Sequence, residues 1–243
     1  MQSWGLTDPG CVRRQNQDAY RIEQLDPGTL LCVVCDGMGG AKSGNVASTL
    51  AVEVFVEEIR RNWVPGMESD RIDQMLKSAV KLANFTVYDQ AAQIEEFSGM
   101  GTTLVAALVR DRKVTIVNVG DSRAYGIDEN GIRQLTKDHS LVQMMVDRGD
   151  LTPEMAKNYP GKNLITRAIG TEPMVFCDIY HRDISKGDYL LLCSDGLSNV
   201  MDDQEILFEV IYGVNKQQCC QQLLAIAKNR GAPDNVTSVL VLV

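Results

Sequence analysis

The stretch LLCVVCDGMGG, residues 30–40, places an apolar run directly before an aspartate and a glycine-rich turn. Residues 30–35 are all apolar, which is typical of a strand. The glycines around Met38 interrupt that run and allow a sharp change of chain direction. We therefore expect a buried strand that ends with the acidic side chain of Asp36 at the edge of a sheet.

Three further aspartates adjoin an apolar run and a turn in the same way. They are Asp121 in VGDSR (119–123), Asp195 in LLCSDGLS (191–198) and Asp234 in APDNVTS (232–238). Carboxylates at strand ends converge on one sheet edge, where two charges about 4 Å apart repel by about 4 kcal/mol near a protein surface. Such a cluster requires cations, so the sequence predicts a multi-metal site with oxygen ligands.

The residue types around the aspartates indicate which metal would bind. Only His139 and His181 are present, and no histidine or cysteine spacing suits zinc. Carboxylate oxygens favour magnesium or manganese, and the flexible backbone at Gly37 can bring its carbonyl oxygen to an ion. Two such ions about 3.5–4 Å apart clamp phosphate oxygens and lower the pKa of water. That chemistry suits the hydrolysis of phosphomonoesters.

A phosphate also requires a guanidinium, which binds its oxygens with two hydrogen bonds. The candidates are Arg13, Arg14, Arg123 and Arg167. The first two lie in the polar segment TDPGCVRRQNQD, residues 7–18, where Arg13 precedes Asp18 by five residues. We expect Arg13 and Asp18 to face one site.

Composition limits the partners and the location. The net charge of −8, from 24 basic and 32 acidic residues, argues against nucleic acid or an anionic membrane as the main partner. The seven cysteines are interpreted as free thiols of a reducing compartment. Cys32 and Cys35 form a C-x-x-C pattern, but in a strand they point to opposite faces. We find no signal peptide and no apolar run of about 20 residues, and expect a soluble, cytoplasmic monomer.

The periodicity of the chain predicts an α+β fold. Strands are expected at 29–35, 102–109, 113–119, 123–127, 188–193 and 236–243, and helices at 47–59, 69–94, 206–211 and 220–227. Asp111-Arg112 is a tight turn, so two of the strands form a hairpin. Ser69 is predicted to cap the second helix. Hairpin-linked strands and paired helices predict two mainly antiparallel stacked sheets covered by helices.

Residues 140–170 break this regularity. They mix short helical patterns with Gly149, Pro153, Pro160 and Gly161. Long irregular segments in compact domains are often functional, so we interpret this one as a mobile flap. The alternative is an ordinary surface loop with a short helix.

In its ordered motifs the chain resembles the metal-dependent protein phosphatases of type 2C, in their compact bacterial form. The motifs are TDPGCVRRQNQD (7–18), VVCDGMGG (33–40), SGMGTTLVAAL (98–108), NVGDSRAY (118–125), LTKDHSLV (135–142), NLITRAIG (163–170), GDYLLLCSDGL (187–197) and PDNVTSVLV (233–241). The resemblance covers residues 1–243 as a single catalytic domain. It implies a four-layer αββα sandwich that hydrolyses phosphoserine and phosphothreonine with Mn²⁺ or Mg²⁺.

The resemblance also implies a set of metal ligands. Asp36 would bridge two ions, and the carbonyl of Gly37 would bind one of them. Asp195 and Asp234 would complete the binuclear centre. Asp121, together with Asp195, would hold a third and weaker ion.

Three catalytic residues follow from the same resemblance. Arg13 would bind the substrate phosphate, Asp18 would act through metal-bound water, and Asn235 would support the site. The 140–170 segment falls where the family has its flap.

The chain departs from some relatives at three positions. Met38 stands where animal members have a histidine proposed as general acid, and His139 is given a structural role rather than that of a substitute. Asn45 replaces a common glutamate and can still cap the helix. Gln17 replaces an acidic residue, which removes one carboxylate that could hold water.

The leading hypothesis is a phosphatase that opposes a Ser/Thr protein kinase, dephosphorylating the kinase and its substrates without a phosphoenzyme. One alternative is a phosphoprotein-binding module that has lost catalysis. A missing metal ligand would favour it, but all four aspartates are present. Another alternative is a phosphatase of regulators in a partner-switching pathway, which commonly carries a sensor domain for which this chain has no room.

Overall fold

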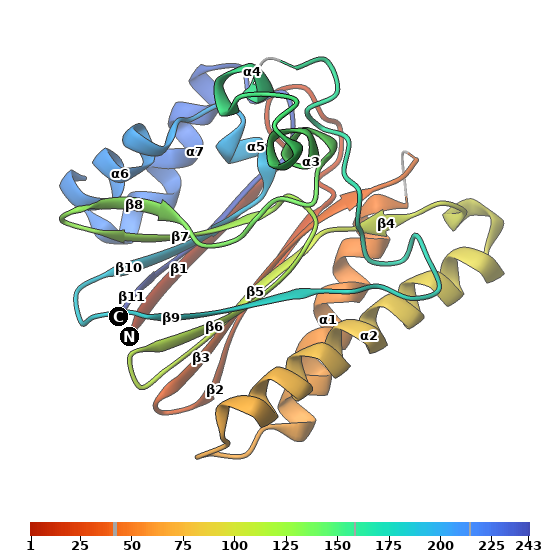
Figure 1. Ribbon diagram of the computed structural model, residues 1–243, viewed down its shortest axis with the longest axis horizontal. Helices are drawn as coiled ribbons and strands as arrows, with labels where there is room; N and C mark the ends of the chain where they lie inside the picture. Colours follow the sequence, from red (N-terminus) through yellow and green to blue (C-terminus); the bar gives the residue numbers. More distant parts are fainter. Residues whose placement is uncertain (41–42, 158, 214) are drawn as a thin grey trace.

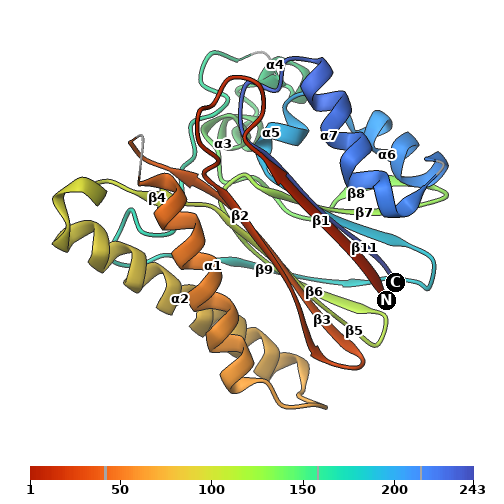
Figure 2. The ribbon, with the colours of Figure 1, turned by 180° about the vertical axis from the view of Figure 1, so that it is seen from behind.

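Two antiparallel sheets stack face to face between two layers of helices (Figures 1 and 2). The computed structural model describes residues 1–40, 43–157, 159–213 and 215–243. The predicted αββα sandwich is confirmed. Each sheet has an apolar face towards the other sheet and a second apolar face towards its helices, which is why the chain forms four layers.

One sheet contains both ends of the chain. Its strand order is β1 (Gln2–Asp8), β11 (Val236–Leu242), β10 (Tyr189–Cys193), β7 (Arg123–Asp128) and β8 (Gly131–Gln134). Gln2 pairs with Leu242 in an antiparallel register, so the two termini lie side by side (Figure 1).

The second sheet is built around the stretch that opens the sequence analysis. Its order is β2 (Asp18–Asp26), β3 (Thr29–Met38), β5 (Leu104–Arg110), β6 (Lys113–Val119) and β9 (Asp178–Asp183), and β4 (Gly101–Thr102) also pairs with β3. The predicted hairpin is β5–β6. Its turn residues Asp111 and Arg112 have φ of 51° and 60°, values that match the right-handed twist of a two-residue hairpin.

Helices cover the outer face of each sheet. The second sheet is covered by α1 (Gly44–Asn62) and α2 (Ser69–Gln93), which continues into the 3₁₀ turn η1 (Glu95–Phe97). The first is covered by α5 (Asp195–Ser198), α6 (Asp203–Tyr212) and α7 (Cys219–Asn229), with the 3₁₀ turn η2 (Lys216–Gln218) before α7. None of the helices in the described ranges is both long and apolar enough to cross a bilayer.

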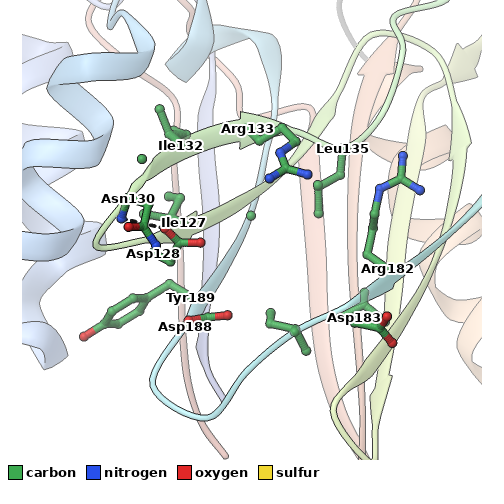
Figure 3. A pocket seen from close by; sticks show the side chains of 14 residues that line it. Ile127, Asp128, Asn130, Ile132, Arg133, Leu135, Arg182, Asp183, Asp188 and Tyr189 are labelled. Atoms are coloured by element: carbon green, nitrogen blue, oxygen red, sulfur yellow. Dashed lines mark hydrogen bonds between the residues drawn. The ribbon is translucent and has the colours of Figure 1, made fainter.

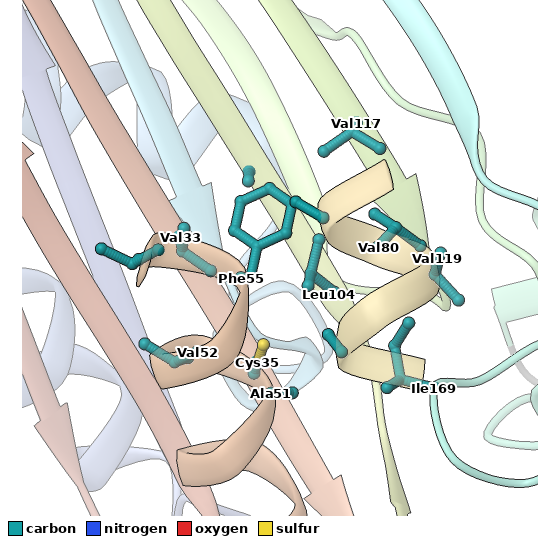
Figure 4. Close-up of a cluster of buried hydrophobic side chains, with 14 of the residues drawn as sticks. Val33, Cys35, Ala51, Val52, Phe55, Val80, Leu104, Val117, Val119 and Ile169 are labelled. Atoms are coloured by element: carbon teal, nitrogen blue, oxygen red, sulfur yellow. The ribbon is translucent and has the colours of Figure 1, made fainter. Parts of the chain in front are cut away.

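Alternate residues of β3 serve two different cores. Leu31, Val33 and Cys35 pack against α1 and α2 around the fully buried Phe55 (Figure 4). Leu30, Cys32 and Val34 point the other way, into the core between the sheets. Because Cys32 belongs to one core and Cys35 to the other, the prediction that the C-x-x-C pair faces opposite ways is confirmed.

Two predicted helix caps are wrong. The N-cap of α2 is Glu68, so Ser69 is already the first helical residue and its side chain cannot cap. The N-cap of α1 is Ser43, which places Asn45 inside the first turn. Helix α1 begins three residues before the expected 47–59, because a first turn on the surface needs no apolar residue, while α2 begins at the expected residue.

The segment 140–170 contains α3 (Leu141–Arg148) and α4 (Pro153–Lys157); Asn158 lies outside the described residues. Its ends are joined, because Leu141 N–H donates to the Leu164 carbonyl at 2.8 Å and Thr166 N–H donates to the His139 carbonyl at 2.8 Å. In Figure 1, α3, α4 and α5 gather at one end of the sheets, away from the termini. The two short helices and the irregular path agree with the expected mixture of short helical patterns and turns.

Candidate active site

Strand register brings the first two carboxylates together. Asp18 begins β2, Asp36 lies near the end of β3, and the two residues are directly opposite in the antiparallel pair. Side chains of directly opposed residues lie on the same face of a sheet. The N-terminal segment and the first aspartate-glycine turn therefore meet at one sheet edge, as the sequence predicts.

Asp36 lies at the centre of the acidic cluster. Burial raises the pKa of its carboxyl well above the ordinary range, and neighbouring negative charges raise it further. Those charges belong to Asp18, Asp195, Asp121 and Asp234. The structure thus gathers all four aspartates of the strand-end pattern, together with Asp18, within electrostatic reach of one another.

Gly37 occupies a place that no other residue could fill. A Cβ there would lie 2.0 Å from the Gly44 carbonyl oxygen and 2.5 Å from that of Gln17. The chain passes this point with Gly37 N–H donating to the Gln17 carbonyl at 3.0 Å. The absence of a side chain is therefore a packing requirement, and it leaves the backbone of Gly37 next to Asp36.

Asp195 enters the cluster at the start of α5, directly after β10. Its Oδ2 accepts from Asn199 Nδ2 at 2.9 Å, while its Oδ1 is buried with no hydrogen-bond partner among the described residues. Burial, followed by the charge of Asp234, raises the pKa of this carboxyl.

Asp121 is presented by a tight turn after β6. Burial and then the charge of Asp195 raise the pKa of Asp121 to about 7. The preceding Gly120 has φ +106°, and a Cβ there would lie 2.6 Å from the Thr103 side chain. Only glycine adopts this conformation without strain.

Asp18 is nearly inaccessible and is held by two hydroxyls. Ser194 and Thr237 donate to its Oδ2 at 2.7 and 2.6 Å, while its Oδ1 is buried and has no partner in the described part of the chain. Burial raises the pKa of Asp18 to about 6, although the two hydroxyls act in the opposite direction. An oriented carboxylate with one free oxygen can accept a further proton donor.

Arg13 brings positive charge to the cluster. Its Nη2 lies 2.8 Å from Asp234 Oδ2, and about half of its side chain, 53%, is exposed. The hydrogen bond to Asp234 raises the pKa of Arg13 more than any other contact, and the charges of Asp36 and Asp195 add to it. Its exposed guanidinium can still reach an anion from solution.

Two of the other candidate guanidiniums are occupied elsewhere. Arg123 binds both oxygens of Asp138 with its Nε and Nη2, and Arg167 donates to Asp178 Oδ1 at 2.9 Å. A half-buried guanidinium that binds one carboxylate with two nitrogens, as Arg123 does, is a structural element.

Asn235 is buried and fastens the N-terminal loop to the site. Its Nδ2 donates to the carbonyls of Pro9 and Gln15 at 3.1 and 3.0 Å, and its Oδ1 accepts from Gln17 N–H at 2.8 Å. The loop between these contacts carries Arg13. The amide of Asn235 therefore fixes the segment on which the guanidinium sits.

The cluster fits divalent cations by the chemistry of its donors. Every candidate ligand is an oxygen, which Mg²⁺ and Mn²⁺ prefer. Buried carboxylate oxygens without partners, Asp18 Oδ1 and Asp195 Oδ1, are costly unless a cation or water compensates them. In the described ranges, however, no group of three or more His, Cys, Asp or Glu side chains is already arranged to hold an ion.

Hydroxyl groups around the cluster were not singled out in the sequence. Thr103 Oγ1 accepts from Asp36 N–H at 2.9 Å and lies 2.7 Å from Ser122 Oγ, while Ser194 and Thr237 hold Asp18. Each is adjacent or nearly adjacent to a motif aspartate or glycine, and that proximity was the available signal.

A cavity of about 200 Å³ lies away from this cluster, between the β7–β8 hairpin and the β9–β10 connection (Figure 3). Leu135 and Ile184 form part of its apolar wall, and Arg133 and Arg182 lie near it. None of the predicted site residues lines it. The acidic cluster, and not this cavity, carries the chemistry predicted from the sequence.

Comparisons with known proteins agree with the geometry. The profile of the family described as protein phosphatase 2C matches residues 12–224. The chain is 34% identical to the serine/threonine phosphatase stp of Listeria welshimeri, over 97% of this chain and 93% of that protein. It is 35% identical to the protein phosphatase PhpP of Streptococcus pneumoniae, over 97% of this chain and 95% of the relative.

Solved structures show the same likeness. The serine/threonine phosphatase Stp1 from Staphylococcus aureus superposes with a TM-score of 0.94 at 37% identity, covering 100% of this chain and 94% of that structure. The phosphatase PstP/Ppp of Mycobacterium tuberculosis superposes with a TM-score of 0.87 at 33% identity, covering 98% and 97%.

Proposed function

This chain belongs to the protein phosphatase 2C family and is a serine/threonine phosphatase of that type, and we propose that it works at a binuclear Mn²⁺ or Mg²⁺ centre. The observation that carries the proposal is the partly buried carboxylate cluster around Asp36, whose pKa is raised by desolvation and then by the charges of four neighbouring aspartates. Metal dependence is a property of the family, and a cluster with this much uncompensated charge is suited to cations.

The ligands of the centre would be those that surround Asp36. Two ions would be held by the carboxylates of Asp36, Asp195 and Asp234 and by the carbonyl of Gly37. Asp121 and Asp195 would hold a third ion. After burial, the charge of Asp195 raises the pKa of Asp121 more than any other contact. When bound, the two ions supply Lewis-acid chemistry, which makes hydroxide available at neutral pH to attack phosphorus.

The protein's own groups position the substrate and move protons. Arg13 would exchange part of its contact with Asp234 for two hydrogen bonds to the phosphate, because its guanidinium is half exposed. Asp18 would orient water through its free Oδ1, with Ser194 and Thr237 fixing the carboxylate. Asn235 would keep the loop that carries Arg13 in place.

The domain organisation and the biological setting are part of the proposal. We infer that residues 1–243 act as one catalytic domain, with the 140–170 segment as a flap beside the site. Its solvent-facing α3, which has no buried residue, supports that role. The protein would act in the cytoplasm as a monomer on phosphoproteins, including a Ser/Thr protein kinase and that kinase's substrates. The net charge of −8 disfavours nucleic acid and anionic membranes as partners.

A direct assay tests the proposal. Purified protein is incubated with a phosphothreonine peptide in Mn²⁺, in Mg²⁺ and in a chelator, beside Asp36→Asn and the control Asp111→Asn, which alters an 82% exposed carboxylate in the β5–β6 turn. We expect metal-dependent phosphate release from the wild type and the control, and a loss of at least about 100-fold in Asp36→Asn, since even outer-shell changes cost about 10- to 100-fold. No turnover with either metal, in folded protein that still binds the peptide, would favour a phosphoprotein-binding module instead.

A further inference from the structure

His139 lies between the turn that presents Asp121 and the base of the 140–170 segment. It is 8% exposed, and it lies five residues after the end of β8. The function proposed above gives this histidine no role, although both of its ring nitrogens and both of its backbone groups make contacts.

The first set of contacts fixes the backbone of Gly120. Gly120 N–H donates to His139 Nδ1 at 3.0 Å, and His139 N–H donates to the Gly120 carbonyl at 2.9 Å. Asn118 Nδ2 donates to the same carbonyl at 3.2 Å. Both polar groups of the residue directly before Asp121 are thus fixed, and one of them depends on the imidazole.

The second set of contacts decides which nitrogen of the ring carries the proton. Because Nδ1 accepts from Gly120, the neutral ring has its proton on Nε2, which lies 3.2 Å from Asp178 Oδ2 and 3.1 Å from Arg167 Nη1. Since a guanidinium can only donate, Asp178 is the acceptor for this proton. Asp178 is itself held by Arg167 Nη1, 2.9 Å from its Oδ1. The carboxylate on β9 therefore orients the imidazole so that its acceptor nitrogen faces the turn.

These contacts leave the ring without a free nitrogen for acid-base chemistry. Nδ1 is directed to a backbone N–H and Nε2 to Asp178, so His139 is not placed to protonate a leaving group. A buried histidine that only filled space would not need an acceptor aimed at the residue next to a metal ligand.

We propose that His139 is a positioning residue, which sets the Gly120–Asp121 turn through its Nδ1 acceptor so that Asp121 is held ready for a metal ion. The inference rests on the proposed function. Ser122, on the other side of Asp121, is held by Thr103, whose hydroxyl also accepts from Asp36 N–H. The turn is therefore fixed on both sides, from His139 and from the strand that carries the central ligand.

Two substitutions distinguish the contact of Nδ1 with Gly120 from the contact of Nε2 with Asp178. In His139→Asn the amide oxygen falls near the position of Nδ1 and keeps an acceptor for Gly120, whereas in His139→Gln the amide reaches towards Asp178 and leaves Gly120 N–H without an acceptor. His181→Gln is the matched control, because this 53% exposed histidine pairs with Asp73 on α2, away from the cluster.

The measurement is Mn²⁺ binding by isothermal titration calorimetry, with KM for a phosphothreonine peptide determined in saturating Mn²⁺. We expect His139→Gln to weaken the weakest Mn²⁺ site by roughly 10- to 100-fold, the usual effect of an outer-shell change. His139→Asn should restore most of that affinity, His181→Gln should match the wild type, and KM should stay constant across the series.

Equal Mn²⁺ affinities for the Asn and Gln variants would overturn the inference while leaving the proposed function intact. Unfolding of either variant at the assay temperature would show that the hydrogen bond between Gly120 and His139 serves folding, which would also overturn the inference. A wild type that binds no Mn²⁺ would overturn the proposed function and this inference together.

Discussion

The body and the end of β3 are opposite environments on a single strand. Residues 30–35 are apolar and buried on both faces, between α1 and α2 on one side and the other sheet on the opposite side. One residue later, Asp36 is half-buried, and the removal of its carboxyl from water, followed by like charges around it, raises its pKa. The same strand therefore stabilises the fold along residues 30–35 and destabilises it at Asp36, where like charges lie close together.

The two environments should respond oppositely to substitution. Full burial of a large apolar side chain stabilises a fold by about 1.5–3 kcal/mol, whereas a buried charge without a partner destabilises it. Removing a side chain from the body should therefore reduce stability and spare catalysis. Removing one from the tip should abolish catalysis and spare the stability of the metal-free protein.

The largest effect is expected in the core against which the body of β3 packs, where Phe55 of α1 is fully buried. Phe55→Ala should lower the free energy of unfolding by about 3–5 kcal/mol, the usual loss for a buried phenylalanine, while turnover per folded molecule stays unchanged. Urea unfolding followed by circular dichroism measures this. The control is Phe85→Ala on α2, which alters a phenylalanine that is 61% exposed. Equal losses of unfolding free energy for both variants would contradict the prediction that burial in this core is the source of stability.

At the tip, Asp36→Asn in a chelator should unfold at the same or a higher urea concentration than the wild type. The amide has nearly the shape of the carboxyl but no charge, so the repulsion from Asp18 and Asp195 disappears. The same variant should lose phosphatase activity by at least about 100-fold. A loss of stability comparable to that of Phe55→Ala would show that the tip, too, is a source of stability.

The pH dependence of stability sharpens the contrast. The pKa of Asp18 is about 6 in the folded chain against the ordinary 3.8, so the folded state binds this proton more tightly than the unfolded state. The contribution is fully present below pH 3.8, and is lost as the pH rises through about 6. Protonation of Asp18 contributes at most about 3 kcal/mol to the free energy of unfolding.

Asp18→Asn removes this titration. Urea unfolding in chelator at several pH values from 4 to 7.5 should show the wild type losing stability relative to the variant as the pH rises. Other carboxyls titrate in both proteins, so the difference between the two curves reports Asp18 together with the effect of its charge on Asp36. A difference that does not change with pH, or that grows in favour of the wild type, would contradict the prediction.

The smallest effect is expected where the N-terminal loop is fastened. Asn235→Ala breaks three hydrogen bonds to that loop and should cost about 1–3 kcal/mol. It should also raise KM for a phosphopeptide, because Arg13 is carried by the loop. Asn62→Ala, an exposed amide at the end of α1 that bonds Glu58, is the control. A drop in kcat with KM unchanged would place Asn235 in the chemistry and not in the loop.

Sequence alone predicted the parts of the fold in which local pattern and burial coincide. The apolar runs foretold β3, β5, β6, β7, β10 and β11, and the turn residues foretold the β5–β6 hairpin. The strand expected at 102–109 joined the end of β4 to β5, and β1, β2, β8 and β9 were missed. A strand such as β9, with the sequence DIYHRD, has no fully buried residue, so it shows neither an apolar run nor clean alternation.

The candidate site divides along a similar line. The aspartates were found because each adjoins a strand and a turn, and the family resemblance assigned their roles. The hydroxyls that hold Asp18 were not, because Ser194 and Thr237 lie 176 and 219 positions away along the chain. Their pairing with Asp18 arises only when the two sheets stack, and the local sequence marks these hydroxyls only by their place near the motif aspartates.

The pairing of β1 with β11 has a consequence for how the molecule is made. β11 follows every other strand along the chain, yet it sits between β1 and β10 and brings Asp234 and Thr237 with it. During synthesis, β1 has no partner in its sheet until β11 emerges. A nascent chain that stops short of β11 therefore lacks both a closed sheet and a complete acidic cluster. Catalytic competence would then appear abruptly with the last strand, so incomplete products could not strip phosphate from cellular proteins.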